Sequence, residues 1–65
     1  MKITVNGDSR EIDTLTLAGA LDALGYGEQK VATALNETFI PSARREATEL
    51  SEGDRLEILS PRQGG

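Results

Sequence analysis

The chain has 65 residues, of which seven are basic and eleven are acidic, so its formal charge is −4 at pH 7. The sequence contains neither cysteine nor histidine, which excludes disulfides, thiolate nucleophiles, Cys-ligated zinc and iron–sulfur clusters and removes the commonest general base. The acidic charge also disfavours nucleic acid and anionic membranes as partners, because both are negatively charged.

The first predicted elements form a β-hairpin. Residues 2–6 alternate between polar and apolar side chains, a pattern that is typical of a half-buried strand. Asn6 and Gly7 follow as an Asn-Gly pair, the strongest short-range hairpin signal, because both residue types tolerate a positive φ. Residues 9–13 are then predicted to be an antiparallel second strand, with Ile12 as its clearest core residue.

A short amphipathic helix is predicted next. The apolar period changes from two to about 3.6, and one helical face collects Leu17, Ala20, Leu21 and Leu24. Thr16 is the expected N-cap, and Gly25 stands where a helix commonly ends in a left-handed residue. Gly19 should weaken the helix somewhat. A helix of about eight or nine residues is not stable alone, so it must pack against the sheet.

Two further strands are expected after this helix. Residues 31–35 form the first, and Asn36 and Glu37 form a turn into a short extended segment that runs to Ile40. Pro41 ends that segment or confines it to a sheet edge, because proline cannot donate a ladder hydrogen bond.

The C-terminal part contains the last strand. Residues 42–50 are highly charged with poor periodicity, so a loop with at most one helical turn is predicted there. A turn at residues 51–54 leads into residues 55–60, where Leu56 and Ile58 are expected to face the core.

This element order predicts an α+β fold of the β-grasp (ubiquitin-like) type. We expect one domain over residues 1–65, with a mixed sheet of four to five strands covered by one main helix. In that arrangement the last strand lies in the middle of the sheet, and residues 61–65 leave it as a flexible di-glycine tail. No stretch of the sequence resembles a secretory signal or approaches the ~20 apolar residues of a membrane helix. A cytoplasmic protein that is monomeric when free is therefore expected.

No catalytic or metal site is predicted inside the domain. Catalytic carboxylates work as apposed pairs with divergent environments, whereas the acidic residues of the C-terminal half are dispersed over a loop, a turn and a strand: Glu46, Glu49, Glu52, Asp54 and Glu57. They are interpreted as a solvated face. Arg44 and Arg45 are expected to form surface ion pairs with neighbouring glutamates. The chain is therefore not expected to be an enzyme.

Two apolar positions are candidates for a partner surface. Leu59 should lie on the sheet face opposite Leu56 and Ile58. Phe39 and Ile40 are adjacent, so one of them must face away from the core, and the sequence leaves open which one. An exposed Phe39 or Leu59 could anchor a partner. The alternative is that both are scattered apolar surface residues, which are common.

The C-terminal SPRQGG is the strongest functional candidate. Gly64 and Gly65 form a thread without side chains that could enter a narrow active site and expose the terminal carbonyl to attack. A free terminal carboxylate is ionised at neutral pH and inert to nucleophiles. It therefore needs activation, for which adenylation by ATP is the obvious route. A sulfur nucleophile could then displace AMP and leave a thiocarboxylate.

Several segments together resemble the ThiS family, the sulfur carriers of thiamine (thiazole) biosynthesis. They are MKITVNG, TLTLAGALDALGY, VATALNETFIP, LSEGDRLEILSP and QGG, and they cover nearly the whole chain. The third and the last two are the most specific. The resemblance implies a β-grasp fold with Gly65 as the covalent site and Gly64 as its obligatory slender neighbour. Gln63 and Arg62, both polar, would follow Pro61 and enter the partner with the tail.

The resemblance also implies partners. A ThiF-type enzyme would adenylate Gly65 with ATP and magnesium bound to that enzyme, so this chain would hold no cofactor. A sulfur-transfer enzyme such as a cysteine desulfurase would supply sulfur, and a thiazole synthase of the ThiG type would receive it. Two alternatives are a carrier for molybdopterin or another sulfur metabolite and a non-covalent β-grasp binding module. The short length and the SPRQGG ending favour the thiamine branch.

Overall fold

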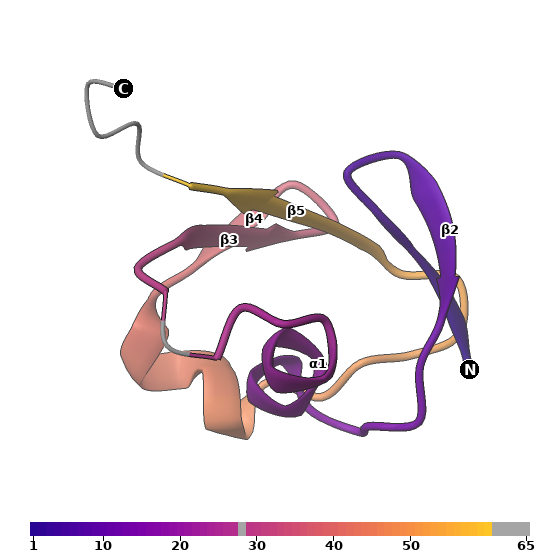
Figure 1. Ribbon diagram of the computed structural model, residues 1–65, viewed down its shortest axis with the longest axis horizontal. Coiled ribbons are helices and arrows are strands. Elements are labelled where there is room, and N and C mark those ends of the chain that lie inside the picture. Colours follow the sequence, from indigo (N-terminus) through magenta and orange to yellow (C-terminus); the bar gives the residue numbers. More distant parts are fainter. Residues whose placement is uncertain (28, 61–65) are drawn as a thin grey trace.

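The computed structural model describes residues 1–27 and 29–60 as a five-stranded mixed sheet packed on one α-helix. The strand order is β2-β1-β5-β3-β4, with β1 and β5 parallel and the other neighbours antiparallel. Figure 1 shows the helix below one face of the sheet, and none of the described residues forms a helix on the opposite face. The elements are β1 (Lys2–Val5), β2 (Asp8–Glu11), α1 (Leu17–Ala23), β3 (Ala32–Leu35), β4 (Thr38–Ile40), the 3₁₀ helix η1 (Ser42–Ala47) and β5 (Arg55–Leu59). The predicted β-grasp order is confirmed, including the central position of the last strand.

The N-terminal hairpin forms as predicted. Lys2 pairs with Glu11 and Val5 with Asp8, and the turn between the strands has φ of 52° at Asn6 and 89° at Gly7. Positive φ at both central residues defines the type of turn whose twist matches antiparallel strands. The second strand ends at Glu11, two residues earlier than expected, although Ile12 is buried as predicted.

The helix begins at Leu17 behind the predicted N-cap Thr16, and the predicted Gly25 follows its C-cap residue Leu24. The side-chain oxygen of Thr16 accepts a hydrogen bond from the backbone N–H of Gly19 at 3.1 Å, which satisfies one of the unpaired N–H groups of the first turn. Gly25 follows the helix with φ of 93°, a conformation that favours glycine. Leu17, Ala20 and Leu21 are buried, and the helix has seven residues instead of eight or nine.

Glycine at position 19 has a packing reason that the sequence does not reveal. A Cβ atom added there would lie 3.0 Å from the Cβ of Thr14. The loop before the helix therefore comes close to the first helical turn, and it can do so because residue 19 has no side chain.

The second half of the sheet is an antiparallel pair closed by a tight turn. β3 and β4 pair from Thr33 with Ile40 to Leu35 with Thr38, and the turn residues Asn36 and Glu37 have φ of 50° and 73°. β4 is an edge strand of three residues that ends before Pro41, as the sequence predicts.

A single apolar core lies between the sheet and α1. It comprises Ile3, Val5, Ile12, Leu17, Ala20, Leu21, Leu50, Leu56 and Ile58, none more than 6% exposed. Leu56 and Ile58 alternate with the exposed Arg55, Glu57 and Leu59 along β5. The central strand thus contributes one face to the core and one to the outer surface.

The segment after β4 is a 3₁₀ helix, and one of its arginines contradicts the sequence interpretation. The guanidinium of Arg45 donates from Nε to the hydroxyl of Thr33 at 3.2 Å and from Nη2 to the carbonyl of Val31 at 2.6 Å. Neither Arg44 nor Arg45 forms an ion pair within the described ranges. Arg45 instead connects η1 to the segment of β3, where the 1% exposed Thr33 also donates to the carbonyl of Ile40 at 2.8 Å.

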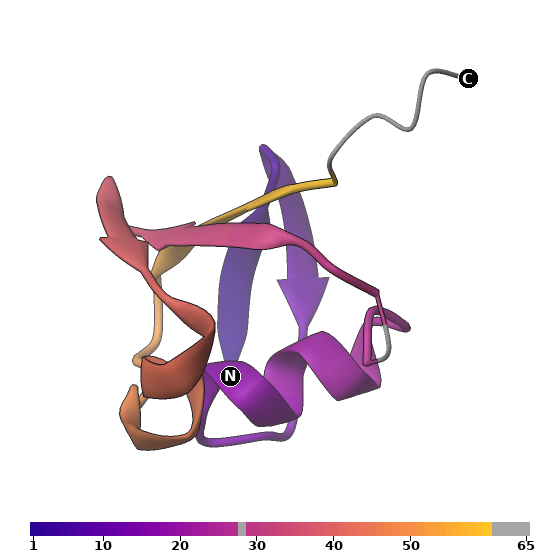
Figure 2. The same cartoon turned by 90° about the vertical axis from the view of Figure 1, so that its left-hand side faces the viewer.

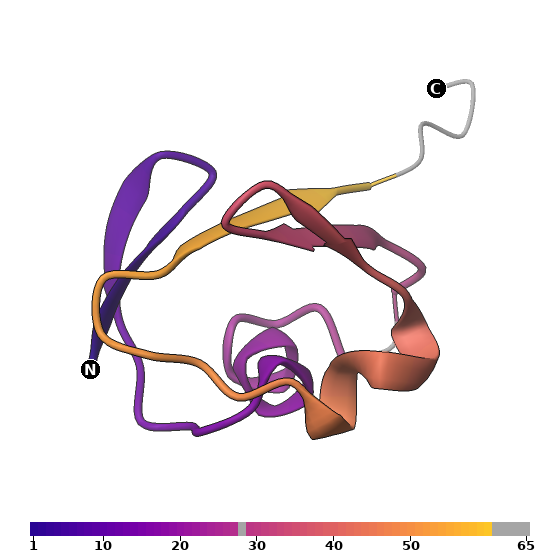
Figure 3. The same cartoon turned by 180° about the vertical axis from the view of Figure 1, so that it is seen from behind.

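Figures 2 and 3 show η1 beside α1, on the helix side of the sheet. The residues after η1 hold the start of α1, since the N–H of Leu17 donates to the carbonyl of Thr48 and that of Leu50 to the carbonyl of Leu15. Among residues 1–27 and 29–60, no helix has the length and apolarity needed to cross a membrane.

Substitution of Leu56 tests the central role of β5. Leu56 is 1% exposed, so Leu56→Ala should lower the free energy of unfolding by about 2–5 kcal/mol through lost burial and a residual cavity. Leu59→Ala is the matched control on the same strand: Leu59 is 72% exposed, and its truncation should change stability by no more than about 0.5 kcal/mol. Urea unfolding measures both, and equal effects would contradict the assignment of the two faces.

Adjacent arginines test the connection between η1 and β3. Arg45→Ala should lower the free energy of unfolding by about 1–3 kcal/mol, because the Val31 carbonyl and the Thr33 hydroxyl each lose a charged donor. Arg44→Ala should change it by no more than about 0.5 kcal/mol, since the Arg44 side chain is exposed. Thermal unfolding followed by circular dichroism distinguishes the two variants. A similar loss of stability in both would contradict the connection through Arg45.

Candidate functional site

The outer face of the sheet, opposite α1, holds the candidate docking surface. Three large apolar side chains are mostly exposed: Leu15 at 70%, Phe39 at 63% and Leu59 at 72%. Phe39 and Leu59 lie on this outer face, on β4 and β5, whereas Leu15 precedes α1. The sequence left open whether Phe39 or Ile40 faces outward. The structure places Phe39 outside and packs the partly buried Ile40 against the core.

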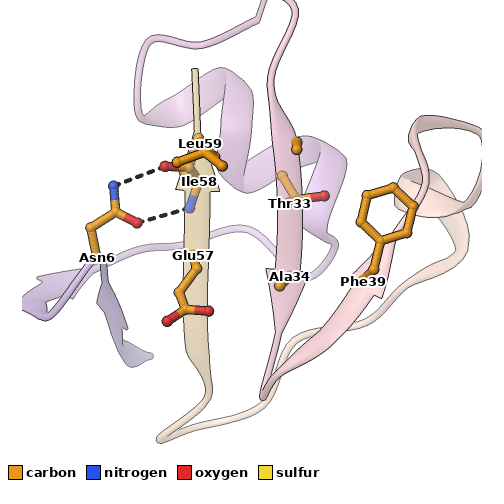
Figure 4. A pocket seen from close by; sticks show the side chains of 8 residues that line it. Asn6, Thr33, Ala34, Phe39, Glu57, Ile58 and Leu59 are labelled. Atoms are coloured by element: carbon orange, nitrogen blue, oxygen red, sulfur yellow. Dashed lines mark hydrogen bonds between the residues drawn. The ribbon is translucent and has the colours of Figure 1, made fainter. Parts of the chain in front are cut away.

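A groove of about 500 Å³ lies between Phe39 and Leu59. Ala32 is paired with Leu59, and Ala34 is paired with both Phe39 and Glu57. Small alanine side chains therefore form the floor on β3, while larger side chains rise on β4 and β5 (Figure 4). The described residues that line it are Asn6, Ala32, Thr33, Ala34, Phe39, Glu57, Ile58 and Leu59.

The described lining of the groove is mainly apolar and includes the carboxylate of Glu57. It could therefore receive apolar side chains of a partner, with a basic group opposite Glu57. The alternating alanines in VATAL were the sequence signal for its floor, because a predicted strand places residues 32 and 34 on one face. The alanines form a groove floor only because Phe39 on β4 and Leu59 on β5 lie on either side of them. Periodicity alone does not predict this arrangement of the strands.

Asn6 is a site residue that the sequence reasoning missed. Its side-chain amide forms two hydrogen bonds with the backbone of Ile58: Oδ1 accepts from the Ile58 N–H at 2.8 Å, and Nδ2 donates to the Ile58 carbonyl at 3.1 Å (Figure 4). Asn6 was recognised only as a turn residue. It also contacts the end of the strand that leads to the C-terminal tail.

The predicted tail residues Arg62, Gln63, Gly64 and Gly65 lie outside the described residues, as does Pro61. The structure does define where the chain enters this segment. β5 ends at Leu59, and Ser60 follows as an exposed residue. Leu59 is thus both the last residue of the central strand and a wall of the groove. The candidate docking surface therefore lies next to the tail in the sequence.

The acidic residues form no chemical centre in the part of the chain that the structure describes. No group of three His, Cys, Asp or Glu residues there could hold a metal ion. Asp54 has a structural role, since its carboxylate accepts from the N–H of Ser51 at 2.7 Å and from the Asn36 side chain at 3.0 Å. Glu37 pairs with Arg55 at 3.4 Å on the surface.

Comparison with known proteins identifies the family. The model of the ThiS family matches residues 3–65, nearly the whole chain. The chain belongs to the ThiS family. A crystal structure of the thiamine biosynthesis protein (ThiS) from Geobacter metallireducens superposes with a TM-score of 0.84 at 30% identity, with each chain covered completely. A solution structure of a thiamine biosynthesis protein from the same organism gives 0.81 at 30% identity, covering all of this chain and 88% of the other.

A curated relative has a different overall length. A thiazole synthase from Paramagnetospirillum magneticum (strain ATCC 700264 / AMB-1) is 32% identical over 66 residues, which include all of this chain. The chain spans only a fifth of that protein's length. These comparisons confirm the resemblance to ThiS and the ubiquitin-like β-grasp fold seen in the sequence.

Proposed function

We propose that this chain is a sulfur carrier protein for thiamine (thiazole) biosynthesis and acts as a protein co-substrate, not as an enzyme. The match of the ThiS family model to residues 3–65 is the observation that carries this proposal. The two similar Geobacter metallireducens structures are of thiamine biosynthesis proteins, which supports the pathway.

The proposed reactive group is the main-chain carboxylate of Gly65. This carboxylate attacks the α-phosphorus of ATP on a ThiF-type enzyme that also binds magnesium, and pyrophosphate leaves. The outer sulfur of a persulfide on a sulfur-transfer enzyme such as a cysteine desulfurase then attacks the activated carbonyl carbon, the bond from that carbon to the AMP oxygen breaks, and AMP leaves. A thiol attacks the inner sulfur of the resulting acyl disulfide and forms a disulfide with the transfer enzyme, so that the thiocarboxylate leaves on the chain. Gly64 keeps the approach to this carbon free of side chains, and Gln63 and Arg62 accompany it into the partner.

The proposed acceptor of the sulfur is a thiazole synthase of the ThiG type. The similarity to a segment of the Paramagnetospirillum magneticum thiazole synthase supports this choice. The described domain would contribute docking: the groove between Phe39 and Leu59 offers apolar area on the sheet face without a helix. Docking there would place the partner next to the end of β5, where the chain continues toward Gly65.

The groove also favours the second candidate, a non-covalent β-grasp binding module, because an apolar docking surface has a use without any tail chemistry. A carrier for molybdopterin or another sulfur metabolite would share both the groove and the tail chemistry. Tail chemistry distinguishes the binding module from a sulfur carrier. The identity of the acceptor enzyme distinguishes a carrier for another sulfur metabolite from a carrier for thiamine biosynthesis.

The C-terminal carboxylate is tested directly by intact mass spectrometry. After incubation with a ThiF-type enzyme, ATP, magnesium and a sulfur source, one terminal oxygen should be replaced by sulfur. Deletion of Gly65, or addition of one residue after it, should abolish both adenylation and sulfur transfer, because the reacting carbon is displaced from the partner's active site.

The folded domain of these tail variants should be unchanged, and urea unfolding of each variant provides the control. Sulfur transfer through a chain lengthened or shortened by one residue would contradict the proposed carrier. An unmodified wild-type terminus together with binding that persists without Gly65 would favour the binding module.

The groove is tested by three exposed apolar residues. Phe39→Ala and Leu59→Ala should each weaken binding of the ThiF-type enzyme about tenfold or more, as expected for apolar anchors in an interface. Leu15→Ala is the matched control, because Leu15 is as exposed as Leu59 but lies outside the groove. Binding measured by calorimetry should distinguish them. Equal losses from all three, or none from Phe39 and Leu59, would exclude the groove as the docking surface.

A further inference from the structure

Among residues 1–27 and 29–60, none provides a backbone neighbour for the end of β5 on the side of β1. The register between the two strands covers Thr4 with Arg55 and Val5 with Leu56, and the N–H of Asn6 makes a last ladder bond to the Leu56 carbonyl at 2.9 Å. The chain then turns away, with φ of 52° at Asn6 and 89° at Gly7. Without another partner, the N–H and the carbonyl of Ile58 would be left unpaired on this side.

The side chain of Asn6 replaces the missing strand. In a continued parallel ladder, the Ile58 N–H would donate to the carbonyl of residue 6, and the Ile58 carbonyl would accept from the N–H of residue 8. The primary amide of Asn6 carries the same acceptor and donor as a peptide group. Its Oδ1 and Nδ2 take both places, at 2.8 and 3.1 Å.

Ile58 is the last residue of β5 that is held from the β1 side. Successive residues of a strand direct their N–H and carbonyl groups to opposite neighbours. The N–H and carbonyl of Ile58 point toward β1. Those of the following Leu59 therefore point toward β3, where Leu59 is paired with Ala32. Asn6 therefore supplies the β1-side contact nearest to Ser60, the last described residue before the tail.

We propose that Asn6 is a positioning residue: through its paired hydrogen bonds to Ile58, it fixes the end of β5 and thereby the point from which residues 61–65 reach the activating enzyme. This inference rests on the proposed function. Asparagine suits the position for two independent reasons. It tolerates the left-handed backbone conformation, and its amide can pair with both polar groups of one residue.

The chain offers a matched control at the other end of β5. Asn36 also has a left-handed backbone, with φ of 50°, and its Oδ1 accepts from the N–H of Arg55 at 2.9 Å. Both asparagines thus use side-chain amides to pair with backbone groups of the same strand, but Asn36 does so at the end away from the tail. Glycine retains the left-handed conformation at either position and removes the side-chain bonds.

The test compares Asn6→Gly with Asn36→Gly in two measurements. The first is amide hydrogen exchange by NMR. The Ile58 amide should exchange about tenfold faster in Asn6→Gly than in Asn36→Gly, and the Arg55 amide should show the opposite difference, because each variant exposes the amide that its asparagine pairs. If the Ile58 amide exchanges at the same rate in both variants, Asn6 does not fix the end of β5 and the inference is overturned.

The second measurement is adenylation by a ThiF-type enzyme with ATP and magnesium, followed as pyrophosphate release. Asn6→Gly should lower kcat about tenfold and raise KM by a smaller factor, because the apolar anchors Phe39 and Leu59 are retained while placement of the reacting carbon is lost. Asn36→Gly should stay within about twofold of the wild type in both constants. A general loss of stability would affect the two variants alike, and an equal fall of kcat in both would overturn the positioning role.

Failure of the proposed function remains distinguishable from failure of this inference. A wild-type chain that is never adenylated contradicts the carrier proposal and also the use of Asn6 in presenting the tail. The exchange measurement in that case still decides whether Asn6 holds the end of β5. Normal adenylation of the wild type and of Asn6→Gly contradicts the positioning role alone.

Discussion

The central position of β5 is the constraint on which the rest of the structure depends. This strand is hydrogen-bonded to β1 on one side and β3 on the other, and its alternating side chains divide between the core and the outer face. Leu56 and Ile58 close the core against α1, while Glu57 and Leu59 line the groove. Because both edges of β5 are paired, the chain can leave the sheet only at the strand's end. The fold thus fixes the origin of the C-terminal segment relative to the groove.

Support for this strand comes from side chains that act in place of backbone. Asn6 pairs with Ile58 near the C-terminal end of β5, and Asn36 pairs with Arg55 near its start. Next to β5, Arg45 connects η1 to Thr33 of β3 and to Val31, the residue before that strand. A small domain has little buried area with which to stabilise itself. Paired polar groups around the central strands therefore matter for its geometry, since each would otherwise remain unsatisfied.

In the proposed function, the domain binds the partner and carries the reacting carboxylate, and it does not catalyse the reaction itself. A carboxylate that reacts only after activation by another protein needs two things from its own domain: a surface that the partner recognises and a defined distance from that surface to the reacting carbon. In the proposed function, Phe39, Leu59 and the alanines between them would form that surface. The end of β5, held by Asn6 and by Ala32 of β3, would be the fixed point from which the tail starts.

Sequence alone determined the order of the elements, the two tight turns, the caps of α1 and the inward residues of β5, because each depends on residues close together in the chain. The family was also readable from the sequence. The tertiary structure decided what depends on distant contacts: Phe39 instead of Ile40 faces outward, and Arg45 bonds to Thr33 and Val31 where surface ion pairs with glutamates were expected. The contact between Asn6 and Ile58 joins residues 52 positions apart. Periodicity reports which side of a strand a residue occupies, but only the folded sheet brings a particular donor and acceptor together.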